Sequence, residues 1–412
     1  MQWSSRAMLR LLIVNILDRE EKIMAEWLKT ALIDIVELIG GGTPKTSKAE
    51  YWGGNINWLS VKDFNNENRY VYSTEKTITE EGLNNSSTKL LKKDDIIISA
   101  RGTVGELAMI PFSMAFNQSC YGIRAKEGID SIFLYYLIKN SVRKLKAITH
   151  GSVFDTITRD TFTNIEVAIP DIKTQHRIAK MLADIDDKVE NNQRINNNLQ
   201  EQMEVLHRSW FVDYAPFGGT KPSNWVKADI YSIANIIYGA PFASKLFNTE
   251  GLGKPIIRIR DLREQAFVTY TTEIHPKGHL IQPGDIVVGM DGEFRPYIWG
   301  NSEAWLNQRV CIFESKLPSD KAFMLYTIKP LLNVIEQTQV ATTVIHIGKK
   351  DYDAFEIILP DRNTLDQFGA ITTPMLERIV NNSIENKKLA KLRDVLLPQL
   401  MSGEIGVSDI DL

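Results

Sequence analysis

The sequence lacks the features that would assign it to a metal-binding, disulfide-rich or membrane-spanning class of protein. Cys120 and Cys311 are the only cysteines among the 412 residues. They do not have the spacing of a metal-ligand pair. So few cysteines, without such a pair, favour a reducing, cytoplasmic setting. No apolar run reaches the ~18 residues that a membrane span needs. We therefore expect a protein of the cytoplasm without a membrane segment.

No region of the chain carries an excess of basic residues. The formal net charge is -3 at pH 7, and the ranges 24–170 and 215–360 each contain equal numbers of basic and acidic residues. This balance argues against a broadly basic nucleic-acid-binding surface. Any contact with DNA must come from local patches, or from a partner that supplies positive charge.

Motifs of the common active sites are also missing. There is no Walker A loop, HExxH helix, nucleophile elbow or glycine-rich dinucleotide turn. His275 and His279 have ligand-like spacing, but the proline and glycine between them favour a surface turn. Asp171, Asp186 and Lys188 resemble a nuclease signature, yet the last two lie on a predicted helix as solvated flanks of its apolar face. We assign no catalytic residue and no metal ligand.

Two stretches do carry a clear signal, the heptad pattern of a helix packed along another helix. In 171–214, alternating spacings of four and three give the seam Ile178, Leu182, Ile185, Val189, Asn192, Asn196, Leu199, Met203, Leu206 and Trp210. Each position recurs 190 residues later, as Phe368, Thr372, Met375, Ile379, Asn382, Asn386, Leu389, Arg393, Leu396 and Leu400. The shared register makes the second stretch the predicted partner of the first.

The seams predict how the two helices pair and how long they are. Asparagine in a seam costs stability but fixes register, so we expect the asparagines of the two seams to face each other. Pro374 and Pro398 predict a kink or an end, which restricts the second helix to about 374–397. A fully helical 171–214 would be roughly 66 Å long at ~1.5 Å per residue. That length is about two turns of B-DNA, each ~34 Å.

The rest of the chain is duplicated as well. The matched segments are 26–29 with 224–227, 42–44 with 239–241, 57–63 with 255–261, 95–98 with 285–288, 117–118 with 307–308, and 170–171 with 360–361. The chain thus divides into 24–170, a first domain; 171–214, a helix; 215–360, a second domain; and 361–412, a helix and tail. We interpret residues 1–23 as a short helix, or as sequence upstream of a true start at Met24.

Within each domain the pattern predicts mixed α and β structure. Short β-rich runs, among them 57–63 and 255–261, are bounded by Gly, Asn and Asp. Helices are predicted over 131–147 and 321–337. No βαβ rhythm indicates a parallel sheet. The fold class is therefore α+β, with two mixed α/β domains separated by two long antiparallel coiled-coil helices.

Polar loop tips that differ between the copies are the candidate binding surface. Arg258 and Arg260 alternate on a predicted strand, so their side chains share one face. Arg, Lys, Asn and Asp read base edges in the major groove; ordinary solvated loops are the alternative for each residue. The candidate DNA-binding residues are Lys45, Lys62, Asn65, Arg69, Arg101 and Thr103 in the first copy, and Arg258, Arg260, Arg263, Asp291, Arg295 and Lys349 in the second.

Several motifs together resemble one known family, from Met24 onward. They are Gly-Gly-Thr-Pro at 41–44, Asp-Ile-Ile-Ile-Ser at 95–99, Gly-Lys-Lys-Asp at 348–351, and Leu-Leu-Pro-Gln-Leu-Met-Ser-Gly-Glu-Ile at 396–405. With the duplicated layout, they look like the DNA specificity (S) subunit of Type I restriction-modification enzymes. The leader 1–23 has no assigned place in this pattern.

The resemblance implies a non-catalytic subunit that recognises double-stranded DNA. Each of its two target recognition domains would read one half of a split, asymmetric site, and the helices would set the unread spacer. Two methyltransferase subunits would bring S-adenosylmethionine, and restriction subunits, where the system has them, would bring ATP and Mg²⁺. Two other readings stay open: a duplicated protein-binding scaffold without DNA specificity, and a fragment with its own nuclease.

Overall fold

A computed structural model describes residues 27–66, 68–148, 156–338 and 346–407. It divides into two compact units, Met1–Glu190 with Leu389–Leu412 (unit 1) and Asn191–Lys388 (unit 2). Each unit thus holds one predicted domain and part of each long helix. The leader 1–23 lies outside the described residues. No helix in the described part of the chain has the length and apolarity needed to cross a membrane.

Unit 1 contains two four-stranded sheets and a strand pair. The first sheet is antiparallel, in the order β2 (Val36–Gly40), β9 (Cys120–Ala125), β6 (Ile96–Ser99), β7 (Leu107–Met109). The second sheet has the order β4 (Lys76–Ile78), β3 (Trp52–Leu59), β8 (Met114–Phe116), β5 (Leu90–Leu91), and β3 runs parallel to β8. The antiparallel pair is β1 (Leu28–Ala31) with β10 (Glu166–Ile169). The shorter helices are η1 (Leu32–Ile35), η2 (Ala49–Tyr51), α2 (Val61–Phe64), α3 (Glu80–Asn84), α4 (Ser131–Ile148) and α5 (Arg159–Asn164).

Unit 2 repeats this plan. Its antiparallel sheet has the order β12 (Ala234–Tyr238), β20 (Val310–Ser315), β17 (Ile286–Gly289), β18 (Pro296–Ile298). Its other sheet has the order β13 (Phe247–Asn248), β15 (Tyr270–Thr271), β14 (Lys254–Ile257), β19 (Ala304–Leu306), β16 (Leu280–Ile281), with β14 parallel to β19. The strand pair is β11 (Val226–Asp229) with β21 (Glu356–Leu359). The shorter helices are η3 (Ala215–Phe217), η4 (Ile230–Ser232), η5 (Ser244–Leu246), η6 (Ile259–Asp261), η7 (Pro318–Asp320), α7 (Lys321–Thr338) and α8 (Lys349–Asp353). The predicted duplication and the mixed α/β content are confirmed, and α4 and α7 match the two predicted helices.

Close backbone approaches explain why glycine recurs at matched positions of the two copies. A Cβ atom on Gly41 would lie 2.0 Å from the carbonyl oxygen of Asn117. At the equivalent point of unit 2, a Cβ on Gly239 would lie 2.0 Å from the carbonyl oxygen of Asn307. Only glycine avoids this overlap. The structure thus pairs Gly41 with Gly239, one residue away from the sequence match of 42–44 with 239–241.

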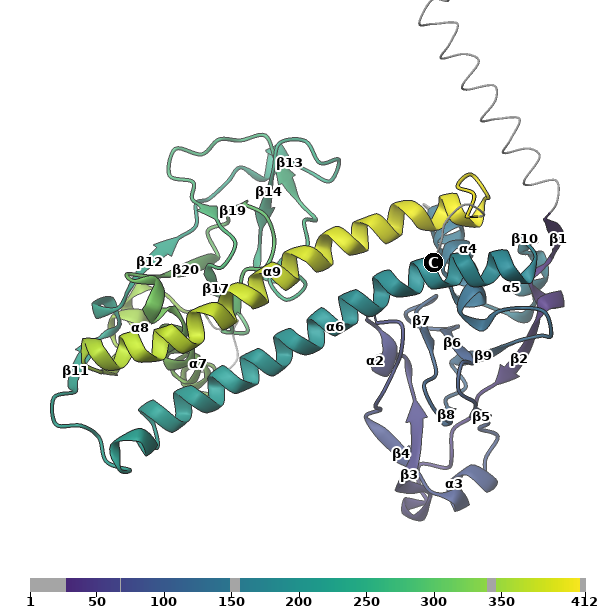
Figure 1. The fold of residues 1–412 in the computed structure, drawn as a ribbon, viewed down its shortest axis with the longest axis horizontal. Coiled ribbons are helices and arrows are strands. Elements are labelled where there is room, and N and C mark those ends of the chain that lie inside the picture. The colour runs from purple at the N-terminus through teal and green to yellow at the C-terminus, as the bar shows by residue number, and fades with distance from the viewer. Residues whose placement is uncertain (1–26, 67, 149–155, 339–345, 408–412) are drawn as a thin grey trace, which may run out of the picture. The chain divides into compact units, whose positions relative to one another are not determined.

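The two long helices are α6 (Ile172–Phe211) and α9 (Arg362–Met401), both unbroken (Figure 1). Asp171 caps α6 by accepting hydrogen bonds from the backbone amides of Lys173 and Thr174. Asp361 caps α9 in the same way, accepting from the Thr364 amide. Side-chain caps of this kind satisfy amides that have no partner within the helix. The predicted helix at 171–214 is confirmed.

The second helix is longer than predicted, because neither proline ends it. Proline lacks an N–H, so Pro398 leaves the carbonyl of Asp394 without its helical donor. In unit 1 the guanidinium of Arg143 approaches that carbonyl, with Nη1 at 3.5 Å, and also forms an ion pair with the Asp394 side chain at 3.0 Å. A neighbouring helix therefore replaces part of what the proline removes. The restriction of this helix to 374–397 was wrong.

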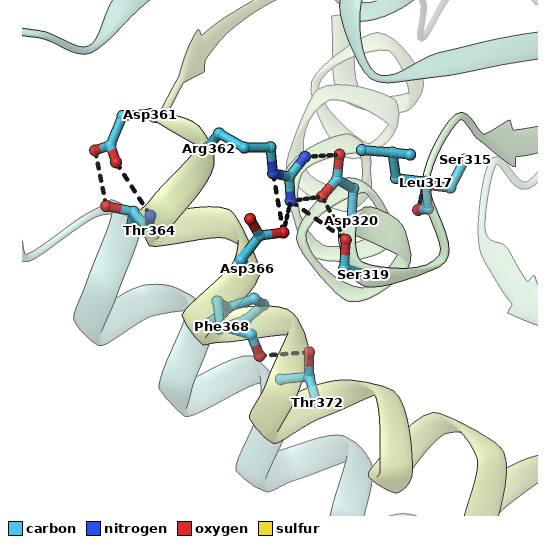
Figure 2. A network of polar contacts seen from close by, with 10 residues as sticks. All are labelled: Ser315, Leu317, Ser319, Asp320, Asp361, Arg362, Thr364, Asp366, Phe368 and Thr372. Carbon is cyan, nitrogen blue, oxygen red and sulfur yellow. Dashed lines mark hydrogen bonds and ion pairs between the residues drawn. The ribbon is translucent and has the colours of Figure 1, made fainter.

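Polar contacts anchor the start of α9 within unit 2 (Figure 2). The guanidinium of Arg362 donates to both carboxylate oxygens of Asp320, at 2.5 and 2.9 Å. It also pairs with Asp366 one turn along the helix, at 2.9 Å. Asp320 is buried and Arg362 is partly exposed. The ion pair thus ties α9 to the short helix η7 that precedes α7.

Candidate functional site

A capped turn follows the strand that pairs in parallel in each unit, β3 in unit 1 and β14 in unit 2. The backbone amide of Ser60 donates to Asp63 at 2.7 Å, and that of Arg258 donates to Asp261 at 3.0 Å. An acidic side chain three residues after the capping position is a helix-start signal. The predicted strands therefore end at residues 59 and 257, and the expectation that Arg258 and Arg260 share a strand face was wrong. Arg260 lies in the helical turn η6.

Three backbone segments meet beside this turn in unit 1, and we call them the three-segment junction. The Ala100 amide donates to the Ser119 carbonyl at 2.8 Å, and the Ile157 amide donates to the Ala100 carbonyl at 2.9 Å. Arg101 and Thr156 form an isolated antiparallel bridge. Gly102 follows with a φ of +78°, a conformation that favours glycine. The junction presents the side chains of residues 101, 119 and 156.

Unit 2 builds the same junction from equivalent residues. The Met290 amide donates to the Arg309 carbonyl at 2.9 Å, and the Ile347 amide donates to the Met290 carbonyl at 2.9 Å. Asp291 and His346 form the isolated bridge, and Gly292 again has a φ of +78°. The backbone is thus held by matched hydrogen bonds, while all three side chains at its tip differ from those of unit 1.

In unit 1 the junction and the capped turn enclose a hollow of about 390 Å³. It brings together four of the six predicted residues of this copy, Lys62, Asn65, Arg101 and Thr103. The other lining residues are Trp58, Ser60, Val61, Glu75, Lys76, Gly102, Asn117 and Ser119. Three cationic side chains and one carboxylate therefore surround amide and hydroxyl groups, an arrangement that suits an anionic, hydrogen-bonding ligand.

The two remaining predictions for unit 1 fall elsewhere. Arg69 is buried and forms an ion pair with Asp187 on α6. Its role as a DNA contact was wrong, because a guanidinium held in the interior cannot reach a base. Lys45 is exposed in a turn in which its carbonyl accepts from the Lys48 amide, and it does not line the hollow.

The predicted residues of unit 2 are paired with nearby carboxylates. Arg260 pairs with Asp261 at 3.8 Å, Arg263 with Glu264 at 3.8 Å, and Arg295 with Glu293 at 3.5 Å. Arg258 pairs with Asp261 at 3.7 Å and also bonds to the hydroxyl of Thr269. Lys349 pairs with Asp353 at 2.8 Å. The charge of each of these cations is therefore partly neutralised.

Asp291 sits in a cluster that includes two residues missed by the sequence analysis. Its carboxylate contacts Nδ1 of His346 at 2.6 Å and Nε of Arg309 at 3.5 Å. Arg309 and His346 occupy segments without a motif of their own. They lie 190 positions after Ser119 and Thr156, however, so the duplication could have flagged them.

The seam of unit 2 is polar at its centre, as predicted. Asn196 accepts from Asn382 at 2.8 Å and donates to the Ile379 carbonyl at 3.2 Å. Asn192 donates to Asn386 at 2.9 Å. Rising numbers on α6 meet falling numbers on α9, so the two helices are antiparallel here. Leu199 packs at the edge of this seam against the core of unit 2.

The seam of unit 1 contains a buried ion pair instead. Asp186 on α6 accepts from Arg393 on α9 at 2.8 Å and from the Tyr136 hydroxyl on α4 at 2.6 Å. Burial raises the pKa of Tyr136, and the Asp186 charge raises it further. The prediction that Asp186 is a solvated flank was therefore wrong. The predicted seam residues Ile185, Val189 and Leu389 are partly buried.

Other candidate reactive groups do not assemble into a centre. The backbone carbonyl of His275 accepts from the Gly278 amide at 2.8 Å, which confirms the predicted turn. Within the described ranges, no three His, Cys, Asp or Glu side chains are grouped to hold a metal ion. Both cysteines are buried, and this raises the pKa of each thiol to about 12.

Comparison with known proteins gives one consistent result. The family model of the Type I restriction modification DNA specificity domain matches residues 24–201 and again 222–393. The MjaIX specificity subunit of Methanocaldococcus jannaschii is 28% identical, over 94% of this chain and 96% of that protein. The EcoBI specificity subunit of Escherichia coli is 35% identical over 33% of this chain and 29% of its own length. The crystal structure of the S subunit from M. genitalium shares the fold, with a TM-score of 0.57 at 15% identity, covering 91% of this chain and 96% of that one.

The fold and the matches define the class first. Two copies of one mixed α/β domain, each followed by a long helix, give the fold of that S subunit. Because two copies of the family model cover most of its length, the chain belongs to the family of Type I restriction-modification specificity subunits.

Proposed function

We propose that this chain is the sequence-specific DNA-recognition subunit of a Type I restriction-modification complex. Each target recognition domain reads one half of a bipartite, asymmetric site in double-stranded DNA. The helices α6 and α9 set the unread spacer. At 40 residues each, they are about 60 Å long at ~1.5 Å per residue.

The observation that carries the proposal is the three-segment junction. Matched hydrogen bonds hold its backbone in both units, yet the tips are Arg101, Ser119 and Thr156 in one and Asp291, Arg309 and His346 in the other. A structural role would favour similar side chains on similar backbones. Different polar tips on one scaffold suit two surfaces that recognise different base sequences.

The helices also offer matched positions for protein partners. Val205 on α6 and Val395 on α9 are separated by the repeat offset of 190. Both are valines and are 67% and 53% exposed. Exposed apolar side chains at equivalent sites suit two copies of one partner. We assign these sites to two methyltransferase subunits, one for each half of the chain.

The chemistry lies on those partners in this proposal. The specificity chain itself is non-catalytic and binds no cofactor. Methyltransferase subunits carry S-adenosylmethionine and methylate adenine, and restriction subunits, in a complete system, carry ATP and Mg²⁺. The complex acts in the cytoplasm, where its substrate is cellular or incoming DNA.

Exchange of one domain tests whether each domain reads its own half of the site. Residues 24–170 are replaced by the same region of a related subunit that keeps an arginine and a tyrosine at positions 69 and 136, because these contact Asp187 and Asp186 on the retained α6. Mapping of methylated adenines in a host with the methyltransferase partner should show one half of the target changed and the other intact. A change in both halves would refute modular reading.

A protein-binding scaffold is the competing function. Contacts with phosphates make DNA affinity fall steeply with salt concentration. If the complex with methyltransferase subunits shows no such dependence, the scaffold explanation replaces the proposal. Cleavage of DNA by the purified chain with Mg²⁺ alone would instead support a nuclease.

A further inference from the structure

The three-segment junction of unit 2 holds an arginine in a way that its counterpart in unit 1 does not. In unit 1, Arg101 stands beside two neutral hydroxyl residues, Ser119 and Thr156. In unit 2, the guanidinium comes from the neighbouring segment, as Arg309, and a carboxylate takes the place of Arg101. The arginine of the junction therefore lies on a different segment in each unit, although the backbone of the junction is the same.

Contacts within the unit 2 cluster fix the direction of the arginine. Asp291 lies 3.5 Å from Nε of Arg309, while Nη1 lies 3.2 Å from Nδ1 of His346. His346 Nδ1 is 2.6 Å from Asp291 and 3.0 Å from the Met290 carbonyl. Nδ1 therefore lies among two acceptor oxygens and the Arg309 guanidinium, so the imidazole holds the carboxylate and the arginine in place.

The outer end of the guanidinium is available for a ligand. The side chain of Arg309 is 52% exposed, whereas that of Asp291 is 24% exposed, so the carboxylate lies behind the arginine. No described residue accepts a hydrogen bond from Nη2. An arginine held from behind loses less conformational freedom when it binds, and its planar fork matches two acceptors at once.

We propose that Arg309 reads a guanine through its O6 and N7 atoms in the half-site bound by unit 2, and that Asp291 and His346 position it. This inference rests on the proposed function. Arginine bidentate to guanine is the commonest specific contact in the major groove, and it needs a fixed approach direction. A phosphate contact needs no such bracing, because phosphate position carries no sequence information. In unit 1 the arginine of the junction is Arg101, which lies on a different segment from Arg309. The base that is read therefore need not have the same position in the two half-sites.

The test uses the complex of this chain with its methyltransferase partner. Duplexes carry the mapped target with each base pair of the second half substituted in turn, and competition binding gives the discrimination at each pair. For Arg309→Ala we expect discrimination at one G·C pair to fall by roughly 10- to 100-fold, with the other pairs unaffected. Lys227→Ala is the matched control, because Lys227 is also an exposed cation paired with a carboxylate, Glu356 at 3.4 Å. It should leave every pair unchanged.

Two further variants separate positioning and phosphate contact from base reading. Asp291→Asn should reduce discrimination at the same pair by less than Arg309→Ala does, without weakening the affinity for a scrambled duplex. Arg309→Lys keeps the charge but not the fork, so it should lose discrimination while keeping the salt dependence. Uniform weakening by Arg309→Ala across all duplexes, with a shallower salt dependence, would identify a phosphate contact and overturn the inference.

Failure of the inference and failure of the proposed function give different results. If the unaltered complex distinguishes target from scrambled DNA, and Arg309→Ala keeps the discrimination at every pair, only the role of Arg309 is refuted. If the unaltered complex does not distinguish them, the proposed function itself is refuted.

Discussion

The two units place different chemistry at the same point of their helix seams. Unit 1 buries Asp186 against Arg393. The repeat offset makes Leu376 and Met203 the equivalent residues of unit 2, and both are buried there as well. The tyrosine beside this position also has a different hydrogen-bond acceptor in each unit. Tyr136 donates to Asp186, whereas its equivalent, Tyr326, donates to the backbone carbonyl of Gln200 at 2.8 Å.

This contrast shows what a buried ion pair contributes to the seam. An apolar pair fills the same space in unit 2 without desolvating a charge, so packing alone does not require the ions. Such pairs often add little net stability over well-packed apolar residues, but breaking one leaves a buried charge without a partner. We interpret the ion pair in unit 1 as a contact that stabilises one register of α6 against α9. The asparagines have the same role in unit 2.

The largest expected effect comes from breaking the ion pair. Asp186→Leu removes the buried carboxylate that lies 2.8 Å from Arg393, so the guanidinium keeps Asp394, at 3.1 Å, but loses its buried partner, and we expect the free energy of unfolding to fall by about 3–5 kcal/mol. Urea denaturation of the full chain measures this change. The double variant Asp186→Leu with Arg393→Met copies the residues of unit 2, and it should recover most of the loss. If the double variant is less stable than the single one, the apolar pair is not an equivalent solution.

The second prediction concerns pH and one residue of unit 2. Burial lowers the pKa of His207 from its ordinary 6.5 to about 4, so the unfolded chain binds this proton more tightly than the folded one. Stability is then full above about pH 6.5 and is lost as the pH falls towards 4. The loss between pH 7 and pH 5 is about 2 kcal/mol.

His207→Leu should remove this contribution, because the equivalent residue of unit 1 is the buried Leu397. Unfolding measured at pH 7 and pH 5 gives the difference. Thr327→Val is the control, since it removes the hydroxyl 3.1 Å from Nε2 of His207 but keeps the imidazole. An equal acid loss in the leucine variant would show that other groups cause it.

A smaller effect is expected at the start of α9 (Figure 2). Arg362→Ile copies Ile172, the equivalent residue of unit 1, and leaves the buried Asp320 without its cation. We expect a loss of about 1.5 kcal/mol in thermal or urea unfolding. Asp366→Ala removes only the exposed pairing within the helix and should cost a few tenths of a kcal/mol. Equal losses in the two variants would mean that the contact with Asp320 contributes nothing of its own.

The smallest expected effect concerns the two exposed valines of the long helices, and it should be equal at both of them. Val205→Glu and Val395→Glu should each weaken the binding of methyltransferase subunits by about 1 kcal/mol, roughly fivefold, because each places a charge at a matched apolar contact. Titration with the purified partner measures affinity and stoichiometry. Val268→Glu, at an exposed valine away from the helices, is the control. An effect of only one of the two helix variants would contradict docking at equivalent sites.

The fold was largely predictable because its signals are periodic and repeated. The seam residues recur every three or four positions, and the copies confirm each other over matched segments, at an offset of 190 from residue 95 onward. The extent of α9 was not predictable in this way. A proline disfavours a helix locally, but whether a side chain such as Arg143 compensates for the lost hydrogen bond depends on the tertiary structure.

The candidate site was predictable only where position determines exposure. Lys62 lies in the short helix α2, Asn65 caps its end, and Arg101 and Thr103 follow β6; the fold gathers all four into one hollow. Arg69 and Asp186 were misjudged, because their burial depends on partners far away in sequence. The acidic residues 63 and 261 carried a helix-start signal that outweighed the alternating strand pattern around them.

The three-segment junction has a consequence for how such a protein acquires new targets. Its backbone–backbone hydrogen bonds use only main-chain atoms, so replacing residues 101, 119, 156, 291 or 309 leaves them in place; the His346 side chain also contacts the Met290 carbonyl, at 3.0 Å. If the junction reads DNA as proposed, mutation at its tips can alter recognition while the backbone stays in place. The chain can drift from one target to another through intermediates that still fold.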